Sequence, residues 1–177
     1  ASDVVVESGD QGTDTVSYGG SASYTLADNL ENLTLTGASA INGIGNDDNN
    51  VMQATANTAA NVLSGGFGDD TYYINVSQGD SVVENAGAGT DIVVVSANAN
   101  NTAYTLANNV ESVLADGAFT MTITGNSASN NLYGDYVGNV SNPSVAQTLS
   151  GGAGDDTYFI GTGDSVLESA GNGTDTV

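Results

Sequence analysis

Apolar residues recur along the chain in short runs, and corners rich in Gly, Asn and Asp separate these runs. The runs are short and evenly spaced, β-branched residues and Gly are frequent, and no apolar stripe with the 3.6-residue period of a helix persists. We therefore predict an all-β chain. The expected strands are 32–36, 50–53, 61–64, 71–74, 81–84, 91–96, 111–114, 120–124, 130–133, 147–150, 157–160 and 165–168.

The polar corners share one frame, in which a polar residue stands two positions before an inward apolar residue. The polar members of this series are Asp3, Asp14, Asn50, Asn61, Asp70, Asp80, Asp91, Asn130, Gln147, Asp156, Asp164 and Asp175. Spacings of about ten residues place successive corners on opposite edges of a flattened coil. Corners about twenty residues apart, such as Asp70 and Asp91, then stack on one edge, so the frame favours a solenoid over a sandwich.

Longer stretches of the sequence also repeat. The motif at 12–16 recurs, with one change, at 89–93 and unchanged at 173–177, and 24–32 matches 104–112. We divide the chain into 1–16, the end of a preceding module, then 17–93 and 94–177, two modules of roughly 80 residues in one continuous solenoid. Because the chain opens and closes at the same phase of the repeat, we expect it to be a stretch of a longer array.

Charge is the next constraint on the fold. The 177 residues include no Lys, Arg, His or Cys, and 21 Asp and Glu give a net charge of −21. Two carboxylates stacked about 4.8 Å apart repel by roughly 3.5 kcal/mol at an effective dielectric constant of about 20. A compact fold therefore requires widely spread charges or a bound cation, and without a cation this composition is typical of disorder. The missing basic residues argue against nucleic-acid binding and against docking on an anionic membrane.

Two nine-residue strings carry the most specific chemistry. Gly65–Tyr73 and Gly151–Phe159 both read Gly-Gly-x-Gly-x-Asp-x-U-x, where U is a large apolar residue. The glycines allow a tight turn with positive φ and exposed carbonyls, and the Asp adds a hard carboxylate ligand of the kind that Ca²⁺ prefers. Both strings resemble the calcium-binding nonapeptide of the repeats-in-toxin (RTX) family, which folds as a parallel β-roll.

The resemblance implies that Ca²⁺ binds at the Asp corners, where Asp70 pairs with Asp91 and Asp156 pairs with Asp175. Carbonyl oxygens of the glycine turns would complete much of each ligand set. The expected ligands are Gly65, Gly66, Gly68, Asp70, Asp91, Gly151, Gly152, Gly154, Asp156 and Asp175, with Asp80 and Asp164 on the opposite edge as weaker candidates. The alternative is a pair of glycine corners that hold no metal.

The chain departs from the RTX pattern because each module has only one full nonapeptide. Other corners have Asn or Gln in place of Asp, and we expect Asn50, Asn61 and Asn130 to form amide ladders between turns, with metal ligation as the alternative. Three acids follow strands in equivalent places and are expected to be solvated, with an outer-ligand role as the alternative: Glu7, Glu84 and Glu168.

Two further features have structural interpretations. Four aromatic residues are expected to fill the interior or to cover one face, and sugar binding is the alternative for them: Tyr72, Tyr73, Tyr158 and Phe159. The stretch 134–146, which contains Pro143, is an insertion relative to the first module and is expected to loop out.

The leading functional hypothesis is a non-enzymatic, calcium-binding structural repeat of a secreted bacterial surface protein. No Ser-His-Asp or Cys-His catalytic set is possible without His and Cys. RTX-like proteins leave the cell by type I secretion, and the chain would then form a stalk, a surface-layer element or a filament of copies stacked head to tail. One alternative is a calcium-dependent folding and secretion segment of an RTX exoenzyme or toxin. Another is an adhesin or ice-binding module, suggested by the Thr-x-Thr strands at 34–36 and 122–124.

Overall fold

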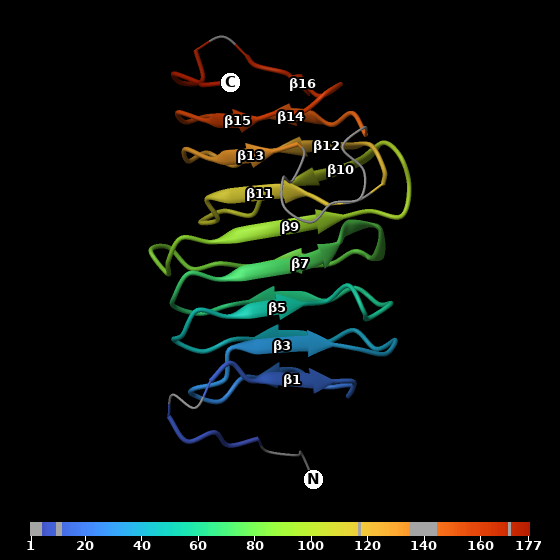
Figure 1. Ribbon diagram of the computed structural model, residues 1–177, viewed down its shortest axis with the longest axis vertical. Coiled ribbons are helices and arrows are strands. Elements are labelled where there is room, and N and C mark those ends of the chain that lie inside the picture. Colours follow the sequence, from blue (N-terminus) through green and yellow to red (C-terminus); the bar gives the residue numbers. More distant parts are fainter. Residues whose placement is uncertain (1–4, 10–11, 117, 135–144, 170) are drawn as a thin grey trace.

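The chain folds as a parallel β-solenoid, as the corner frame predicts. A computed structural model describes residues 5–9, 12–116, 118–134, 145–169 and 171–177. Eight parallel strands form one continuous sheet along the length of the molecule (Figure 1). In sheet order they are β1 (Thr15–Tyr18), β3 (Asn32–Leu35), β5 (Val51–Gln53), β7 (Thr71–Asn75), β9 (Ile92–Ser96), β11 (Ser112–Ala115), β13 (Asn131–Tyr133) and β15 (Thr157–Phe159).

Two four-stranded parallel sheets form the other face. The first consists of β2 (Tyr24–Thr25), β4 (Asn42–Ile44), β6 (Val62–Ser64) and β8 (Ser81–Val82). The second consists of β10 (Thr102–Thr105), β12 (Met121–Thr124), β14 (Thr148–Ser150) and β16 (Ser165–Val166). The chain alternates between the two faces, and Thr71 pairs with Ile92 one turn later. Each turn therefore takes about twenty residues, and corners that far apart in the sequence stack.

The second face is interrupted between β8 and β10, which belong to separate sheets. A single turn of 3₁₀-helix, η1 (Val76–Gln78), follows β7. Asn75 Oδ1 accepts a hydrogen bond from the Ser77 N–H (3.0 Å), and Gly79, at a φ of 88°, ends the turn. At the same level β7 and β9 pair over five residues, so the eight-stranded sheet continues past the interruption.

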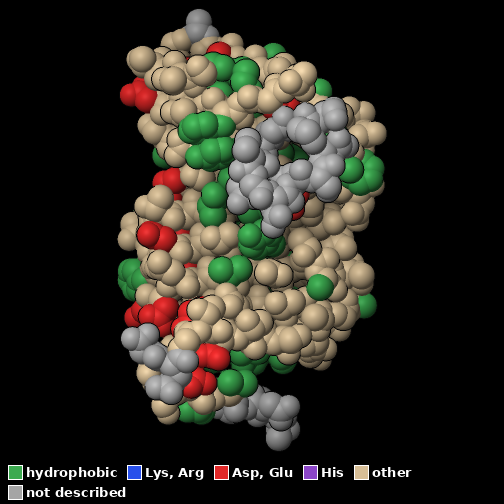
Figure 2. All heavy atoms as spheres, in the orientation of Figure 1, with side chains coloured by type: hydrophobic (Ala, Val, Ile, Leu, Met, Phe, Trp, Pro, Cys, Tyr) green, Lys and Arg blue, Asp and Glu red, His purple; other side chains and the backbone are tan. Residues whose placement is uncertain are grey.

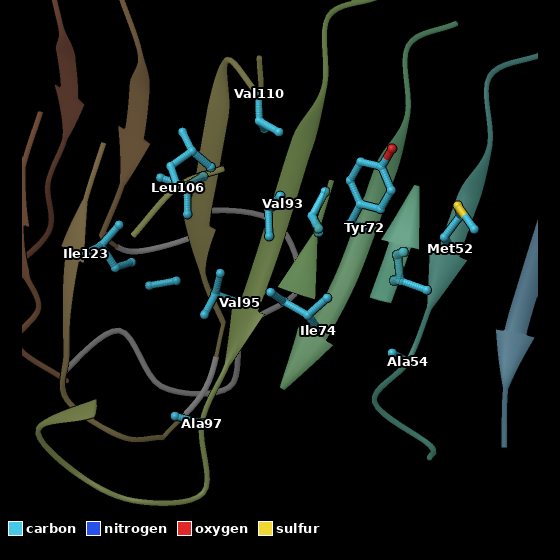
Figure 3. Packing of buried hydrophobic residues seen from close by; sticks show 14 of the residues in the cluster. Met52, Ala54, Tyr72, Ile74, Val93, Val95, Ala97, Leu106, Val110 and Ile123 are labelled. Carbon is cyan, nitrogen blue, oxygen red and sulfur yellow. The ribbon is translucent and has the colours of Figure 1, made fainter. Parts of the chain in front are cut away.

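Inward side chains form apolar rows along the solenoid. Figure 3 shows two rows from the eight-stranded sheet, one with Met52, Tyr72 and Val93 and the other with Ala54, Ile74 and Val95. The opposite face contributes residues such as Leu63 and Leu149, and all of these side chains are fully buried. Because side chains alternate between the two sides of a strand, stacking the turns joins the inward positions into one continuous core.

The predicted strands are all present, with bounds within two residues of those expected. Four strands lie outside the predicted set: β1, β2, β4 and β10. β4 has Gly43 at its centre, where an added Cβ would crowd the side chains of Leu63 (2.9 Å) and Leu33 (3.0 Å). A strand with a central glycine has a weak sequence pattern. Among the described residues, no helix is long and apolar enough to cross a membrane.

Candidate metal centre

Polar corners stack along the edge at which the strands of the eight-stranded sheet begin. At six steps of this column a corner N–H donates to the side chain of the corner one turn later. These bonds join Asp14 to Glu31 (2.8 Å), Asn50 to Asp70 (2.7 Å), Asp70 to Asp91 (2.9 Å), Asp91 to Glu111 (2.7 Å), Asn130 to Asp156 (2.7 Å) and Asp156 to Asp175 (3.0 Å). Figure 2 shows acidic side chains gathered along this edge. The predicted stacking of the two Asp pairs is confirmed, and we call this column the acidic ladder.

The first glycine corner, which ends at Asp70, packs tightly against its neighbours. Gly66 and Gly68 have φ values of 110° and 97°, which side chains rarely adopt. A Cβ on Gly65 would overlap the Asp70 carboxylate. The carbonyl oxygen of Gly68 fills the place that a Cβ on Gly89, one turn later, would occupy. Glycine is therefore required here, and it brings carbonyl oxygens and the carboxylate into one corner.

Behind this corner, Tyr72 and Glu84 form a buried polar pair. The Tyr72 hydroxyl donates to Glu84 Oε1 and lies 3.5 Å from Asp70 Oδ2. The Gly65 N–H donates both to the Tyr72 hydroxyl (2.7 Å) and to Glu84 Oε1 (3.0 Å). Glu84 is only 7% exposed, so the prediction that it is solvated is wrong. Strand alternation explains the error, since the step that turns Val82 inward also turns Glu84 inward.

Burial perturbs the acids of this corner. Removal from water raises the pKa of Asp70 to about 7 and that of Asp91 to about 6, and the nearby Glu84 carboxylate adds to both increases. Asp91 Oδ2 and Glu84 Oε2 are buried and have no hydrogen-bond partner among the described residues. The chain has no basic side chain that could neutralise these acids. The corner therefore favours the binding of protons or of a cation.

The second glycine corner, which ends at Asp156, repeats this arrangement. The Tyr158 hydroxyl donates to Glu168 Oε1, and the Gly151 N–H donates to the Tyr158 hydroxyl and to Glu168 Oε1 (3.2 Å). Burial raises the pKa of Asp156, whose Oδ2 also has no partner among the described residues. Glu168 is exposed, unlike Glu84, so this corner is more open to water. Its turn has positive φ values at Gly152 (98°) and Gly154 (112°).

The two acids of the opposite edge, Asp80 and Asp164, have a different environment. Asp80 accepts the Asn61 N–H through Oδ1 and the Asn75 N–H through Oδ2, both at 3.0 Å. Asp164 likewise accepts the Gln147 N–H (2.7 Å) and the Gly161 N–H (2.9 Å). Both oxygens of each carboxylate are thus engaged by backbone N–H groups. This arrangement favours a role in holding turns together over a role in binding metal.

The Asn corners connect turns by hydrogen bonds, but they do not stack amide on amide. Their Nδ2 groups donate to a backbone carbonyl or to a carboxylate of a neighbouring turn. The bonds join Asn50 to Leu30 O (3.2 Å), Asn130 to Val110 O (3.2 Å) and Asn61 to Asp80 Oδ1 (3.1 Å). The predicted bonding between turns is confirmed, and the partners differ from those of an amide ladder.

The aromatic residues divide between the interior and the outer face. Tyr72 and Tyr158 are buried in the core, whereas Tyr73 and Phe159 lie on the outside of the eight-stranded sheet. There the rings of Tyr133 and Phe159 stack, with centroids 4.2 Å apart and planes 6° from parallel. Residues 135–144 of the predicted insertion lie outside the described residues.

An ion at either glycine corner would have oxygen ligands only. In the described ranges no three acidic side chains are placed to share one ion, so a ligand set would combine the stacked carboxylates with carbonyls of the glycine turn. That donor set suits Ca²⁺. Asp91 Oδ2 and Asp156 Oδ2, which have no hydrogen-bond partner among the described residues, are the carboxylate oxygens that a bound cation would engage. No family model, curated protein or solved structure matches the chain, and membership of the RTX family stays a prediction from the nonapeptides.

Proposed function

We propose that the chain is a calcium-stabilised structural segment of a secreted bacterial surface protein. The observation that carries this proposal is the set of buried carboxylate oxygens at the two glycine corners that have no hydrogen-bond partner within the described part of the structure, in a chain of net charge −21 with no basic side chain. At the first corner Asp70 and Asp91 would hold the ion with carbonyls of Gly65, Gly66 and Gly68. The set at the second corner would be Asp156, Asp175, Gly151, Gly152 and Gly154.

The bound ion would supply positive charge where the acidic ladder concentrates negative charge. Because the ligands converge only in the folded chain, calcium binding and folding would be coupled, and stability would rise with the concentration of free Ca²⁺. In a compartment with little Ca²⁺ the acidic chain would stay expanded, and it would fold where Ca²⁺ is abundant. This property suits a protein that is exported before it folds.

A long, narrow solenoid supports a mechanical role as a stalk, lattice element or filament. Every strand pairing among the described strands is parallel and follows one frame, so further turns can be added without changing the cross-section. Thr176 already pairs with Thr157 beyond β15, in the phase in which Thr15 opens β1. The same pairing could join a following module or a second copy stacked head to tail, and we propose self-association of this kind as the partner interaction.

Ice binding gains no support from the arrangement of the Thr-x-Thr strands. Thr34 lies on β3 in the eight-stranded sheet, whereas Thr122 and Thr124 lie on β12 in a four-stranded sheet of the other face. The two strands therefore do not form one regular array.

A calcium titration tests the proposed function. Far-UV circular dichroism and light scattering would be followed after EDTA stripping, with Mg²⁺ as the ion control. We expect β-structure or its melting temperature to increase with Ca²⁺ and not with Mg²⁺, and growth in scattering at the same step would support stacking. The double variant Asp70→Asn/Asp156→Asn should lose most of the response, whereas Asp47→Asn, at an exposed acid of an Asn corner, should keep it. A stripped chain that is already fully β and ignores Ca²⁺ would refute the proposal.

A further inference from the structure

Three asparagines of the corners, Asn46, Asn57 and Asn126, share one bonding pattern. Each Nδ2 donates to two backbone carbonyls of the preceding turn, three residues apart, and each Oδ1 accepts the N–H two residues later. The carbonyl pairs are Ala27 (2.8 Å) and Leu30 (2.9 Å) for Asn46, Thr36 and Ser39 (both 3.0 Å) for Asn57, and Ala107 (2.7 Å) and Val110 (2.8 Å) for Asn126. The amide thus fills the corner and satisfies its carbonyls.

The glycine corners stack directly on two of these asparagine corners. Val51 pairs with Thr71, so Gly66 takes the place of Asn46 one turn later, and the Phe67 N–H donates to Asn46 O at 3.2 Å. A Cβ on Gly66 would overlap that same carbonyl oxygen. At this position the glycine corner supplies no side-chain amide, and its bond to the Asn46 carbonyl comes from the Phe67 backbone N–H.

The two kinds of corner also differ at the residue four positions after this Asn or Gly. The three asparagine corners continue to a neutral side chain, giving Asn-x-x-x-Asn at 46–50, 57–61 and 126–130. Corners with glycine at this place continue to an acid, giving Gly-x-x-x-Asp at 66–70, 87–91, 152–156 and 171–175. In these seven corners an Asn is thus followed four residues later by a neutral Asn, and a Gly is followed by an acidic Asp.

We infer that this residue pair determines whether a corner is complete on its own or requires a cation. Asn46, Asn57 and Asn126 supply through an amide the hydrogen-bond donors that bridge two turns, and at Gly66 and Gly152 a cation takes that role and neutralises Asp70 and Asp156. The inference rests on the proposed calcium function and deepens it. It assigns metal-independent order to the asparagine corners and metal-dependent order to the glycine corners of the same solenoid.

Converting one corner tests the inference. The triple variant Asn46→Gly/Asp48→Gly/Asn50→Asp turns 45–50 into Gly-Gly-x-Gly-x-Asp. Native mass spectrometry would count bound Ca²⁺, and we expect the variant to hold one ion more than the parent chain. The matched control Asn108→Gly, at an exposed corner residue, should leave the count unchanged. A variant that is β-structured in Ca²⁺ and binds no additional ion would overturn the inference.

Hydrogen exchange of the parent chain gives a second, independent test, which also decides the matter if the triple variant does not fold. Comparing EDTA with Ca²⁺, we expect Ca²⁺ to slow exchange at 65–70 and 151–156 about tenfold more than at 45–50 and 125–130. Equal slowing at all four corners would refute the inference while leaving the proposed function intact. A parent chain that binds no Ca²⁺ would instead refute the proposed function, and the inference with it.

Discussion

Replacement of Tyr72 by Phe removes one hydroxyl from the core and should destabilise the fold measurably. The hydroxyl donates to Glu84 and accepts the Gly65 N–H at 2.7 Å. Hydrogen bonds to charged groups contribute about 1.5–3 kcal/mol, and the Gly65 N–H retains its 3.0 Å bond to Glu84 after the change. We therefore expect a loss of about 2 kcal/mol, or roughly thirtyfold in the unfolding equilibrium.

Urea unfolding followed by circular dichroism at fixed Ca²⁺ measures this loss as a lower midpoint with an unchanged slope. The neighbouring Tyr73→Phe is the matched control, because Tyr73 is only half-buried on the outer face. We expect it to change stability by less than about 0.5 kcal/mol. A double-mutant cycle with Glu84→Gln should show coupling between residues 72 and 84. Equal effects of the two Tyr→Phe changes, or no coupling in the cycle, would refute the role assigned to the buried pair.

Three further predictions concern pH, backbone and core. The pKa values of Asp70 (about 7) and Asp91 (about 6) are raised in the folded chain, so the folded chain binds more protons than the unfolded chain. The EDTA-stripped fold should therefore gain stability as the pH falls from 8 to 5. The melting temperature measures this gain, and a melting temperature that falls over this range contradicts the reasoning. Gly68→Ala should lower the free energy of unfolding by at least about 1–2 kcal/mol, since the φ of Gly68 is 97° and a Cβ would lie 2.8 Å from the Asp48 backbone. Urea titration measures this loss. The control Gly87→Ala, where a Cβ would meet open space, separates backbone strain from the clash. Leu63→Ala should cost about 2–5 kcal/mol because its side chain is fully buried, and a loss below 1 kcal/mol in the same assay would contradict the described core.

Much of this architecture can be predicted from spacing alone. Asp91 lies one turn of the solenoid after Asp70, and the hydrogen bond from the Asp70 N–H to Asp91 Oδ1 confirms that spacing. The inward position of Glu84 was also within reach of the sequence, because it lies two residues after the buried Val82. The prediction that Glu84 is solvated disregarded this alternation of side chains along a strand, which buries the acid beside the Tyr72 hydroxyl.

Other features depend on contacts between turns that no local pattern records. The Asn46 amide reaches carbonyls 16 and 19 residues earlier in the chain, so its role becomes visible only when the turns are stacked. The weak pattern of β4 has a similar origin, because Gly43 is required by the side chains of other turns. The module limits and the calcium ligands stay predictions. The strand register tests how turns stack, but it marks neither the limits of the longer repeat nor the position of an ion.

The interruption between β8 and β10 has a consequence for a solenoid under tension. Ladder hydrogen bonds between parallel turns run along the long axis, so a pulling force along that axis loads them directly. At the interruption no pairing joins the described strands of the second face, and the force passes through the pairing of β7 with β9. These strands are the longest in the eight-stranded sheet, at five residues each, which places the most bonds where a single sheet bears the load. Stretching a tethered molecule should therefore first separate β8 from β10, which share no strand pairing, while the β7–β9 ladder holds the two halves together.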